Sequence, residues 1–321
     1  MIRWIVCLPI VLFQVHGTLL SYSKRIINGY DAKEKEYPWA VALKGIHPQT
    51  RLITYCGATI IDKRWLLSAA HCFWNTKKKN HLTKPENWIV QAGKAKIELG
   101  DVEPNVSHDK EEKHSDVLKT IVGIFRRLFP SDSKQSGNSS TYYKVQNIIV
   151  HPQYQPDDLE YDIALLKLLT PLPSMESGIA KAYLPVDGNS DKWPPEDALC
   201  TFVGWGCRVK DKGPSEKAQV VALKVTPHFI CSLMYQHAAG LNAEHEFCAG
   251  FYQSNVGICP GDSGSGLIYV DEGLPYVVGV ASATHAKEPE GFPGLFTRVS
   301  TFIEWITSTM ETTDDSLFIY K

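Results

Sequence analysis

Three short segments carry side chains that could act together as a nucleophilic catalytic site. An apolar run, residues 66–72, ends with His71 and a cysteine. Asp162 opens a second apolar run, and Ser263 lies in a glycine-rich turn. A serine hydroxyl attacks well only when a neighbouring base takes its proton, and that base needs a carboxylate to hold its tautomer. One His, one Asp that leads into a buried strand and one exposed Ser meet this requirement.

Two further acidic residues compete with Asp162 for the role of the orienting carboxylate. Asp157 and Asp158 stand shortly before it, in a polar stretch. A carboxylate that orients an imidazole acts from a buried position. Because Asp162 leads directly into an apolar run, it is the better candidate.

The elements that must position these side chains are predicted to be short β-strands. Apolar or alternating runs recur between turn residues, a pattern typical of a sandwich or barrel. We therefore predict an all-β fold. The expected strands are 39–43, 58–61, 65–69, 88–92, 145–150, 163–168, 199–203, 220–225, 267–270, 277–280 and 295–299.

One packed helix is expected at the end of the chain. Apolar residues recur there at helical spacing, from Val299 to Ile306. Ser300 is expected to cap this helix, which should end at about Met310. The tail 312–321 is expected to be frayed.

A polar and charged segment, about residues 94–143, interrupts the β pattern. It contains one amphipathic stretch and both glycosylation sequons, at Asn105 and Asn138. A sequon is glycosylated only on an exposed surface of a secreted protein. We therefore interpret the segment as a surface insertion, either a solvated loop with one docked helix or a loop that binds a partner.

The N-terminus has the pattern of a sorting signal rather than of a buried first strand or helix. Arg3 precedes an almost unbroken apolar run, and compact residues follow up to Gly17. The run is too short to span a bilayer, and no other stretch is long and apolar enough. We predict a signal peptide over 1–17, secretion to the extracellular space and no membrane anchor.

Composition excludes several classes of protein. The chain has 321 residues, of which 44% are hydrophobic, as expected for one large or two medium globular domains. A net charge of −2 makes nucleic acid and anionic membranes poor candidates for partners. The eight cysteines become an odd number once Cys7 leaves with the signal, so disulfides and at least one unpaired thiol are expected. Neither cysteines nor histidines have zinc-site spacing, so no metal or cofactor is expected.

Together these segments resemble a trypsin/chymotrypsin-type serine protease of the S1 family, over about residues 26–310. The order His, Asp, Ser differs from that of subtilisin and of the α/β-hydrolases. The resemblance implies two six-stranded antiparallel β-barrels, the first over 26–172 with the insertion and the second over 173–311 with the terminal helix. The matching motifs are Ala69-Ala-His-Cys72, Asp162-Ile-Ala-Leu-Leu166, Gly204-Trp-Gly206 and Gly261-Asp-Ser-Gly264.

Carried over residue by residue, the resemblance implies roles for the site residues. His71 would be the general base, Asp162 its orienting carboxylate and Ser263 the nucleophile. The N–H groups of Gly261 and Ser263 would form the oxyanion hole. Ser282 resembles the serine that supports the triad carboxylate beside the substrate site.

The resemblance also implies activation by cleavage. Lys24 and Arg25 precede Ile26-Ile-Asn-Gly29, which resembles the start of a mature family enzyme. A cut after Arg25 would release the propeptide 18–25 and create an ammonium at Ile26, which is expected to pair with Asp262. The chain is thus expected to be a zymogen with an activating protease as a partner; the alternative is an unprocessed dibasic site.

Three disulfides and one free thiol are implied. Where the family has partners for Cys200 and Cys259, this chain has Tyr269 and Lys287, while Cys207 is an added cysteine. By analogy Cys207 pairs with Cys259 and Cys200 stays free, because direct pairing of Cys200 with Cys207 would need tight folding back across a strand. The expected bridges are Cys56–Cys72, Cys231–Cys248 and Cys207–Cys259.

The primary specificity pocket departs from that of trypsin-like enzymes. Gly257 stands at its base, where those enzymes carry Asp, so basic side chains should bind poorly. Gly294 is expected to leave one wall open, Thr284 to narrow the mouth and Ala283 to remove an aromatic wall. A small or medium apolar residue before the scissile bond is therefore expected.

We thus expect a secreted serine endopeptidase that cleaves protein or peptide substrates, with a proteinaceous inhibitor as a further partner. The alternative is a protease-like homologue with little or no turnover that acts as a binding or regulatory protein. It is favoured by Ser265 and Gly266, which replace the usual Gly-Pro, and by the missing Trp and pocket disulfide. The complete set of catalytic residues favours the enzyme.

Overall fold

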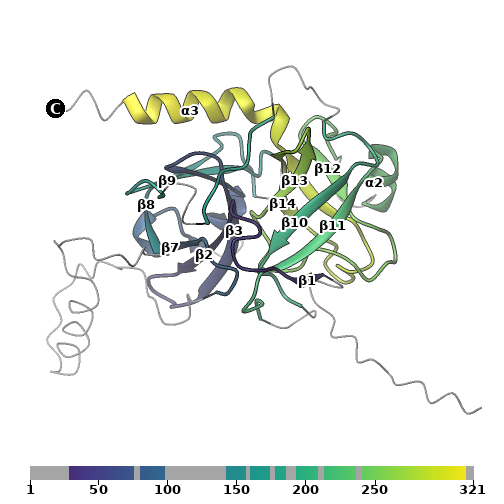
Figure 1. Ribbon diagram of the computed structural model, residues 1–321, viewed down its shortest axis with the longest axis horizontal. Helices are drawn as coiled ribbons and strands as arrows, with labels where there is room; N and C mark the ends of the chain where they lie inside the picture. Colours follow the sequence, from purple (N-terminus) through teal and green to yellow (C-terminus); the bar gives the residue numbers. More distant parts are fainter. Residues whose placement is uncertain are drawn as a thin grey trace, which may run out of the picture.

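The structure covers the segments that carry the candidate site. The predicted signal peptide, the propeptide and nearly all of the insertion lie outside the described residues, as do Arg25, Ile26, Asn105 and Asn138. A computed structural model of the chain describes residues 29–75, 80–97, 142–156, 160–173, 178–185, 193–208, 213–235 and 241–315 (Figure 1).

The first half of the chain forms a closed antiparallel barrel in the order β2-β3-β4-β9-β8-β7. Every residue of β4, β7 and β9 is buried, which is why these strands are mostly apolar in the sequence; the exceptions are Ser68, Gln91 and Lys167. The strands are β2 (Ala40–Ile46), β3 (Ile53–Ile60), β4 (Trp65–Ser68), β7 (Trp88–Ala92), β8 (Tyr142–Val150) and β9 (Ala164–Leu168).

The second half forms another six-stranded barrel, in the order β11-β10-β13-β14-β15-β12. Pairing of β12 with β11 closes it, and the short strand β1 (Tyr30–Asp31) adds to the other side of β11. The predicted all-β fold of two six-stranded barrels is confirmed. The strands are β10 (Leu199–Gly204), β11 (Gln219–Thr226), β12 (Glu246–Ala249), β13 (Gly266–Asp271), β14 (Leu274–Ala283) and β15 (Gly294–Arg298).

Several short elements were not predicted from the sequence, and one of them, β12, is a barrel strand. They lie mostly in the connections between barrel strands. They are η1 (Ala70–Cys72), β5 (Trp74–Asn75), β6 (Asn80–His81), η2 (Pro85–Asn87), α2 (His228–Met234) and β12.

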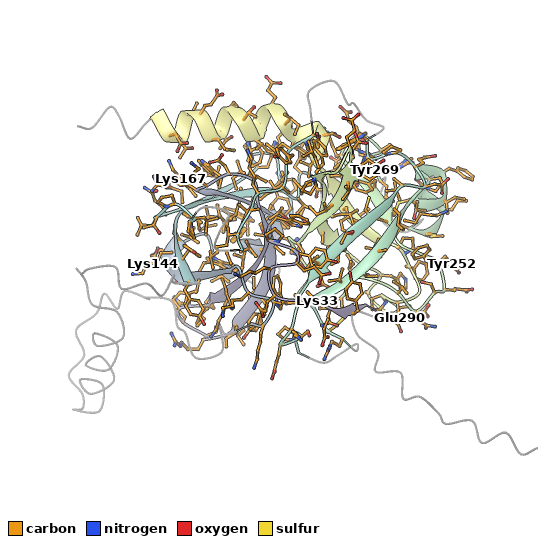
Figure 2. The ribbon with its side chains drawn as sticks, in the orientation of Figure 1. Lys33, Lys144, Lys167, Tyr252, Tyr269 and Glu290 are labelled. Carbon is orange, nitrogen blue, oxygen red and sulfur yellow. A yellow bond between two sulfur atoms is a disulfide. The ribbon has the colours of Figure 1, made fainter. Side chains whose placement is uncertain are left out.

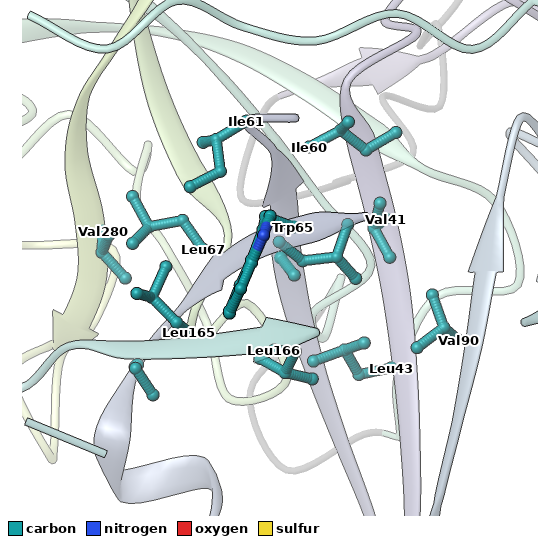
Figure 3. Packing of buried hydrophobic residues seen from close by; sticks show 14 of the residues in the cluster. Val41, Leu43, Ile60, Ile61, Trp65, Leu67, Val90, Leu165, Leu166 and Val280 are labelled. Atoms are coloured by element: carbon teal, nitrogen blue, oxygen red, sulfur yellow. The ribbon is translucent and has the colours of Figure 1, made fainter. Parts of the chain in front are cut away.

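The core of the first barrel continues into the second. Trp65, Leu67 and Leu165 pack at its centre, and Val280 of β14 belongs to the same cluster (Figure 3). The cluster also includes Phe302, close to the start of the terminal helix. Shared burial of apolar side chains therefore fixes one barrel against the other.

The terminal helix begins and ends differently from the prediction. A 3₁₀ turn, η5 (Val299–Phe302), leads into α3 (Ile303–Asp315), which lies beside the first barrel (Figure 1). Ser300 is not the cap, because it lies inside η5 and its hydroxyl donates to the carbonyl of Trp193 at 3.2 Å.

The predicted frayed tail from Thr312 is also wrong, because α3 runs on to Asp315. Lys167, only 1% exposed, points toward this helix (Figure 2). Its ammonium pairs with Asp314 and donates to the carbonyl of Thr313 at 3.2 Å. These contacts hold the last turns in place.

Candidate active site

His71 lies on η1, directly after β4, so a buried strand fixes its position. Its backbone N–H donates to Oδ1 of Asp162 at 2.8 Å, and its ring atom Nδ1 lies 2.7 Å from Oδ2 of the same carboxylate. The contact of Nδ1 with this carboxylate favours the proton on Nδ1, so the lone pair that can accept a proton is on Nε2. His71 can therefore act as a base at Nε2.

Asp162 is completely buried, just before β9. Burial alone would raise the pKa of its carboxyl group. The charge of His71 and the hydrogen bonds from His71 and Ser282 outweigh burial and hold the pKa below its ordinary value. Asp162 is therefore ionised at neutral pH and can stabilise a protonated His71.

Ser282 reaches this carboxylate from the second barrel. The register of β14 against β15 shifts between Ala281 and Ala283, so Ser282 stands at a bulge, which re-aims a side chain. Its Oγ donates to Oδ2 of Asp162 at 2.6 Å, and Oγ1 of Thr297 donates to the backbone carbonyl of Asp162 at 2.9 Å. Hydroxyls from one barrel thus hold the acid of the other.

Ser263 lies in a turn that packs against the loop of His71. The N–H of Gly57 donates to the carbonyl of Ser263 at 2.7 Å, and Gly57 adjoins the disulfide that braces η1. Gly264 has φ +81°, and a Cβ there would overlap the carbonyl oxygen of Gly57 and the hydroxyl of Ser68. The sharp turn therefore requires glycine after the serine.

The N–H groups of Gly261 and Ser263 are available to a ligand. Gly261 has φ +100°, a conformation that favours glycine. Within the ranges that the structure describes, neither N–H donates a hydrogen bond to another protein atom. Two free donors beside a serine hydroxyl can bind an oxygen on which negative charge develops.

The carboxyl group of Asp262 is buried behind this turn. It accepts hydrogen bonds from the N–H groups of Gly206, at 2.7 Å, and of Cys259, at 2.9 Å. Burial raises its pKa to about 7, although both N–H donors act to lower it. Such a group would be stabilised by a cation, and the expected one, the ammonium of Ile26, lies outside the described residues.

The three disulfides pair the cysteines as expected from the sequence. Cys200 of β10 is free and buried. The Cα atoms of the added pair, Cys207 and Cys259, lie 5.4 Å apart, within the usual range for a bridge. The bridges are Cys56–Cys72, Cys207–Cys259 and Cys231–Cys248.

The two glycines expected in the primary pocket leave no room for a side chain at their own positions. A Cβ on Gly257 would overlap the carbonyl oxygen of Pro289. A Cβ on Gly294 would lie 2.6 Å from Cδ1 of Ile258, a side chain that is 3% exposed. Gly294 is therefore packed closely against Ile258, and its role as an open pocket wall stays a prediction.

The two other predicted pocket residues lie where β14 ends. Ala283 is paired with Leu295 of β15. It also packs against the cluster around Cys231 and Cys248. Thr284 follows, and its hydroxyl is buried without a hydrogen-bond partner among the described residues. A buried hydroxyl in this state favours an added acceptor.

The family of the chain can be read from its sequence as a whole. A family model described as Trypsin matches residues 26–120 and 126–306, which include every residue of the candidate site. The chain belongs to the trypsin family of serine proteases.

Curated relatives of this trypsin-family chain are larger proteins. Transmembrane protease serine 9 of Rattus norvegicus is 28% identical over 292 residues, 90% of this chain but 22% of that protein. Transmembrane protease serine 11C of Mus musculus is 28% identical over 91% of this chain and 55% of its own length. Transmembrane protease serine 11B of Homo sapiens is 29% identical, with shares of 92% and 58%. The chain thus spans between about a fifth and somewhat over half of these relatives.

None of the helices in the described ranges is both long and apolar enough to cross a membrane.

Two residues that support the site of this trypsin-family chain, Gly57 and Thr297, were not predicted from the sequence. Gly57 makes room for Ser265, since a Cβ on Gly57 would overlap Oγ of that serine. Ser265 is 2% exposed, and its hydroxyl has no partner in the described part of the chain. Thr297 supports Asp162 from β15. The position of Gly57 beside Cys56 could have indicated the first, but a threonine within a strand carries no such signal.

Proposed function

We propose that this chain is a serine endopeptidase that cleaves through an acyl-enzyme. The observation that carries the proposal is the buried Asp162, which binds both the backbone and the ring of His71 and also accepts the hydroxyl of Ser282. A carboxylate buried in this way orients one imidazole, and the oriented imidazole acts by taking a proton from a nucleophile. Ser263 supplies a hydroxyl in the adjacent turn.

The reaction follows from these positions. Oγ of Ser263 bonds to the substrate carbonyl carbon while its proton passes to Nε2 of His71. The carbonyl oxygen gains negative charge, which the N–H groups of Gly261 and Ser263 bind. His71 then protonates the leaving amine, and water releases the acyl group by the same steps in reverse.

The enzyme is made as a zymogen in this proposal. Cleavage after Arg25 by another protease creates the ammonium of Ile26, which pairs with Asp262. The buried carboxyl group supports this, because the described residues offer it two N–H donors and no cation. An ammonium that entered would neutralise a buried charge and order the turn of Gly261.

The preferred residue before the scissile bond is small or medium and apolar. Ile258 and the carbonyl of Pro289 reduce the space beside Gly294 and Gly257, and both groups are uncharged. Neither Ile258 nor the carbonyl of Pro289 offers a lysine or arginine side chain a counter-ion for the water that it would lose there. Peptides that differ only at this residue (Ala, Val, Leu, Phe and Arg) test the preference, and dominant cleavage after Arg would overturn it.

The protein is secreted, glycosylated at Asn105 and Asn138, and controlled by a proteinaceous inhibitor in this proposal. The apolar run near the N-terminus and the disulfides support passage through an oxidising compartment. Expression of the full chain in cultured cells checks this: processed, glycosylated protein should collect in the medium. Retention on the cell surface would instead favour the membrane attachment that the names of the relatives state for those proteins.

A second candidate function is binding with little turnover. The close packing at Gly257 and Gly294 and the buried hydroxyl of Ser265, which has no partner among the described residues, favour it. A fluorophosphonate probe separates the two functions. After cleavage at Arg25, the enzyme should be labelled at Ser263, and S263A should not. Absence of labelling in the processed wild-type protein would favour the binding protein.

A further inference from the structure

The added disulfide joins the two segments that form the oxyanion turn. Cys207 follows the Gly204-Trp-Gly206 motif, and Cys259 stands directly before the 260–263 turn. Both cysteines are almost fully buried, at 1% and 3% exposed. In the family pattern Cys259 would be tied to the pocket wall at position 287, which is a lysine here. In this chain the disulfide of Cys259 therefore joins the turn of Gly261 to the segment around Gly206 instead of to the pocket wall.

Hydrogen bonds on both sides of the bridge join the same two segments. The N–H of Cys207 donates to the carbonyl of Pro260 at 3.0 Å. The N–H groups of Gly206 and Cys259 both donate to the carboxylate of Asp262, which is the residue before the nucleophile. The N–H of Asp262 also donates to the carbonyl of Cys259 at 2.9 Å. The bridge therefore closes a ring of contacts around Asp262.

Close packing makes the position of Gly261 depend on this ring. A Cβ on Gly261 would lie 3.1 Å from the Cα of Gly206, so the two backbones touch. A Cβ on Gly206 would overlap the carboxylate of Asp262. If the segment around Gly206 moves away, the turn loses both its backbone support and one hydrogen bond to Asp262.

We propose that the Cys207–Cys259 disulfide is a positioning element of the oxyanion hole, which fixes the N–H of Gly261. This inference rests on the proposed function. The ammonium of Ile26 and the disulfide act on the same turn, and full activity requires both. The disulfide acts through Gly206 and Asp262 and does not touch the substrate.

The test compares two double variants of the processed enzyme. In C207S/C259S the N–H of Gly261 is held less firmly, so kcat for a peptide amide should fall 10- to 100-fold while KM changes less than threefold. The control, C231S/C248S, removes a disulfide whose residues make none of these contacts. It should lower the melting temperature but leave kcat within about threefold of the wild type. An equal fall of kcat in both variants would overturn the proposal.

A pH profile separates positioning from general stability. At high pH the ammonium of Ile26 loses its proton and its pairing with Asp262, so activity falls. Without the disulfide the turn depends more on that pairing. The alkaline limb should therefore move to lower pH in C207S/C259S and stay in place in C231S/C248S. An unchanged limb in both variants contradicts the proposal.

A second variant covers the case in which C207S/C259S does not fold. G206A keeps every cysteine and pushes against Asp262, and it should also lower kcat at nearly unchanged KM; a wild-type kcat would overturn the proposal. Amide hydrogen exchange gives a readout without turnover: residues 259–264 should exchange faster in these variants, and residues 53–60 should not. If the processed wild-type protein has no activity, the proposed function fails, while the exchange data still decide whether the disulfide holds the turn.

Discussion

Asp162 has two separate effects on His71, and only a carboxylate provides both. One oxygen accepts the backbone N–H and so fixes the loop, and the other accepts the proton of Nδ1 and so sets the tautomer. An asparagine of the same shape can keep one of these contacts. Its amide group would then donate to Nδ1 and move the ring proton to Nε2, where it blocks catalysis.

D162N should therefore lower kcat by about 10⁴-fold with little change in KM. S282A removes one hydrogen bond to the same carboxylate and should cost about 10-fold, because the other contacts remain. Steady-state kinetics of the processed enzymes measure both. Equal and small losses in the two variants would show that Asp162 does not set the tautomer.

Residue types and order were sufficient to predict the pairing of His71 with Asp162, and the family resemblance predicted the third bridge, but neither could predict how Ile258 packs against Gly294. Asp162 could be chosen over Asp157 and Asp158 because it leads into an apolar run. Ile258 gave no signal, since an apolar residue beside a cysteine is common in any barrel. Whether it lines or fills a pocket depends on packing against Gly294, which no spacing along the chain reveals.

At the scale of elements, an aromatic cluster supports the loop of Asp162. His151, just after β8, stacks on Tyr161 with ring centres 5.1 Å apart and lies 4.8 Å from Trp305 of α3. Tyr161 has φ +56° and directly precedes Asp162. The other rings that face this cluster are those of His245 and Phe302. The cluster thus links β8, α3 and the catalytic loop.

Lowering the pH should reduce the stability that this cluster contributes. Burial and the charge of His245 lower the pKa of His151 to about 4, against about 6.5 in an unfolded chain. Between these values the unfolded chain binds more protons, so the free energy of unfolding should fall by roughly 3 kcal/mol from pH 6.5 to pH 4. Urea unfolding at several pH values measures it. The free energy of unfolding of H151F should change less with pH over this range. A pH dependence equal to that of the wild type would contradict His151 as its origin.

Strand positions could be predicted better than helix ends. The run 88–92 has the same bounds as β7, because an unbroken buried strand shows in its composition. The end of α3 could not be predicted, since residues 311–315 are polar and continue the helix through contacts with Lys167, far away in the sequence. Strand β12 was missed because it begins with a buried charged residue, Glu246, so its four residues neither alternate nor form an apolar run.

At the scale of the molecule, the site exists only where the two barrels meet. His71 and Asp162 come from the first barrel, and Ser263 and Ser282 come from the second. The shared core around Val280 keeps the barrels in register. The proposed activation would therefore be a local change in one turn, between barrels that are already packed together.

R25A should keep the chain intact at the activation site and leave it inactive. Without a free Ile26 ammonium, Asp262 has no cation to pair with, and labelling by a fluorophosphonate probe should be at least about 100-fold slower than in the processed enzyme. K24A is the matched control: it keeps Arg25, so it should be cut and labelled like the wild type. Full labelling of uncut R25A would contradict the switch.

The unpaired Cys200 has a consequence for how the chain matures. Its thiol is 1% exposed, and burial raises its pKa to about 12, so in the finished barrel it is almost entirely in its unreactive, protonated form. If the chain is secreted as proposed, the thiol is exposed to oxidation until the barrel has formed, and it can then make a wrong crosslink with another cysteine. Entry of β10 into its sheet before the last bridge closes would prevent such a crosslink.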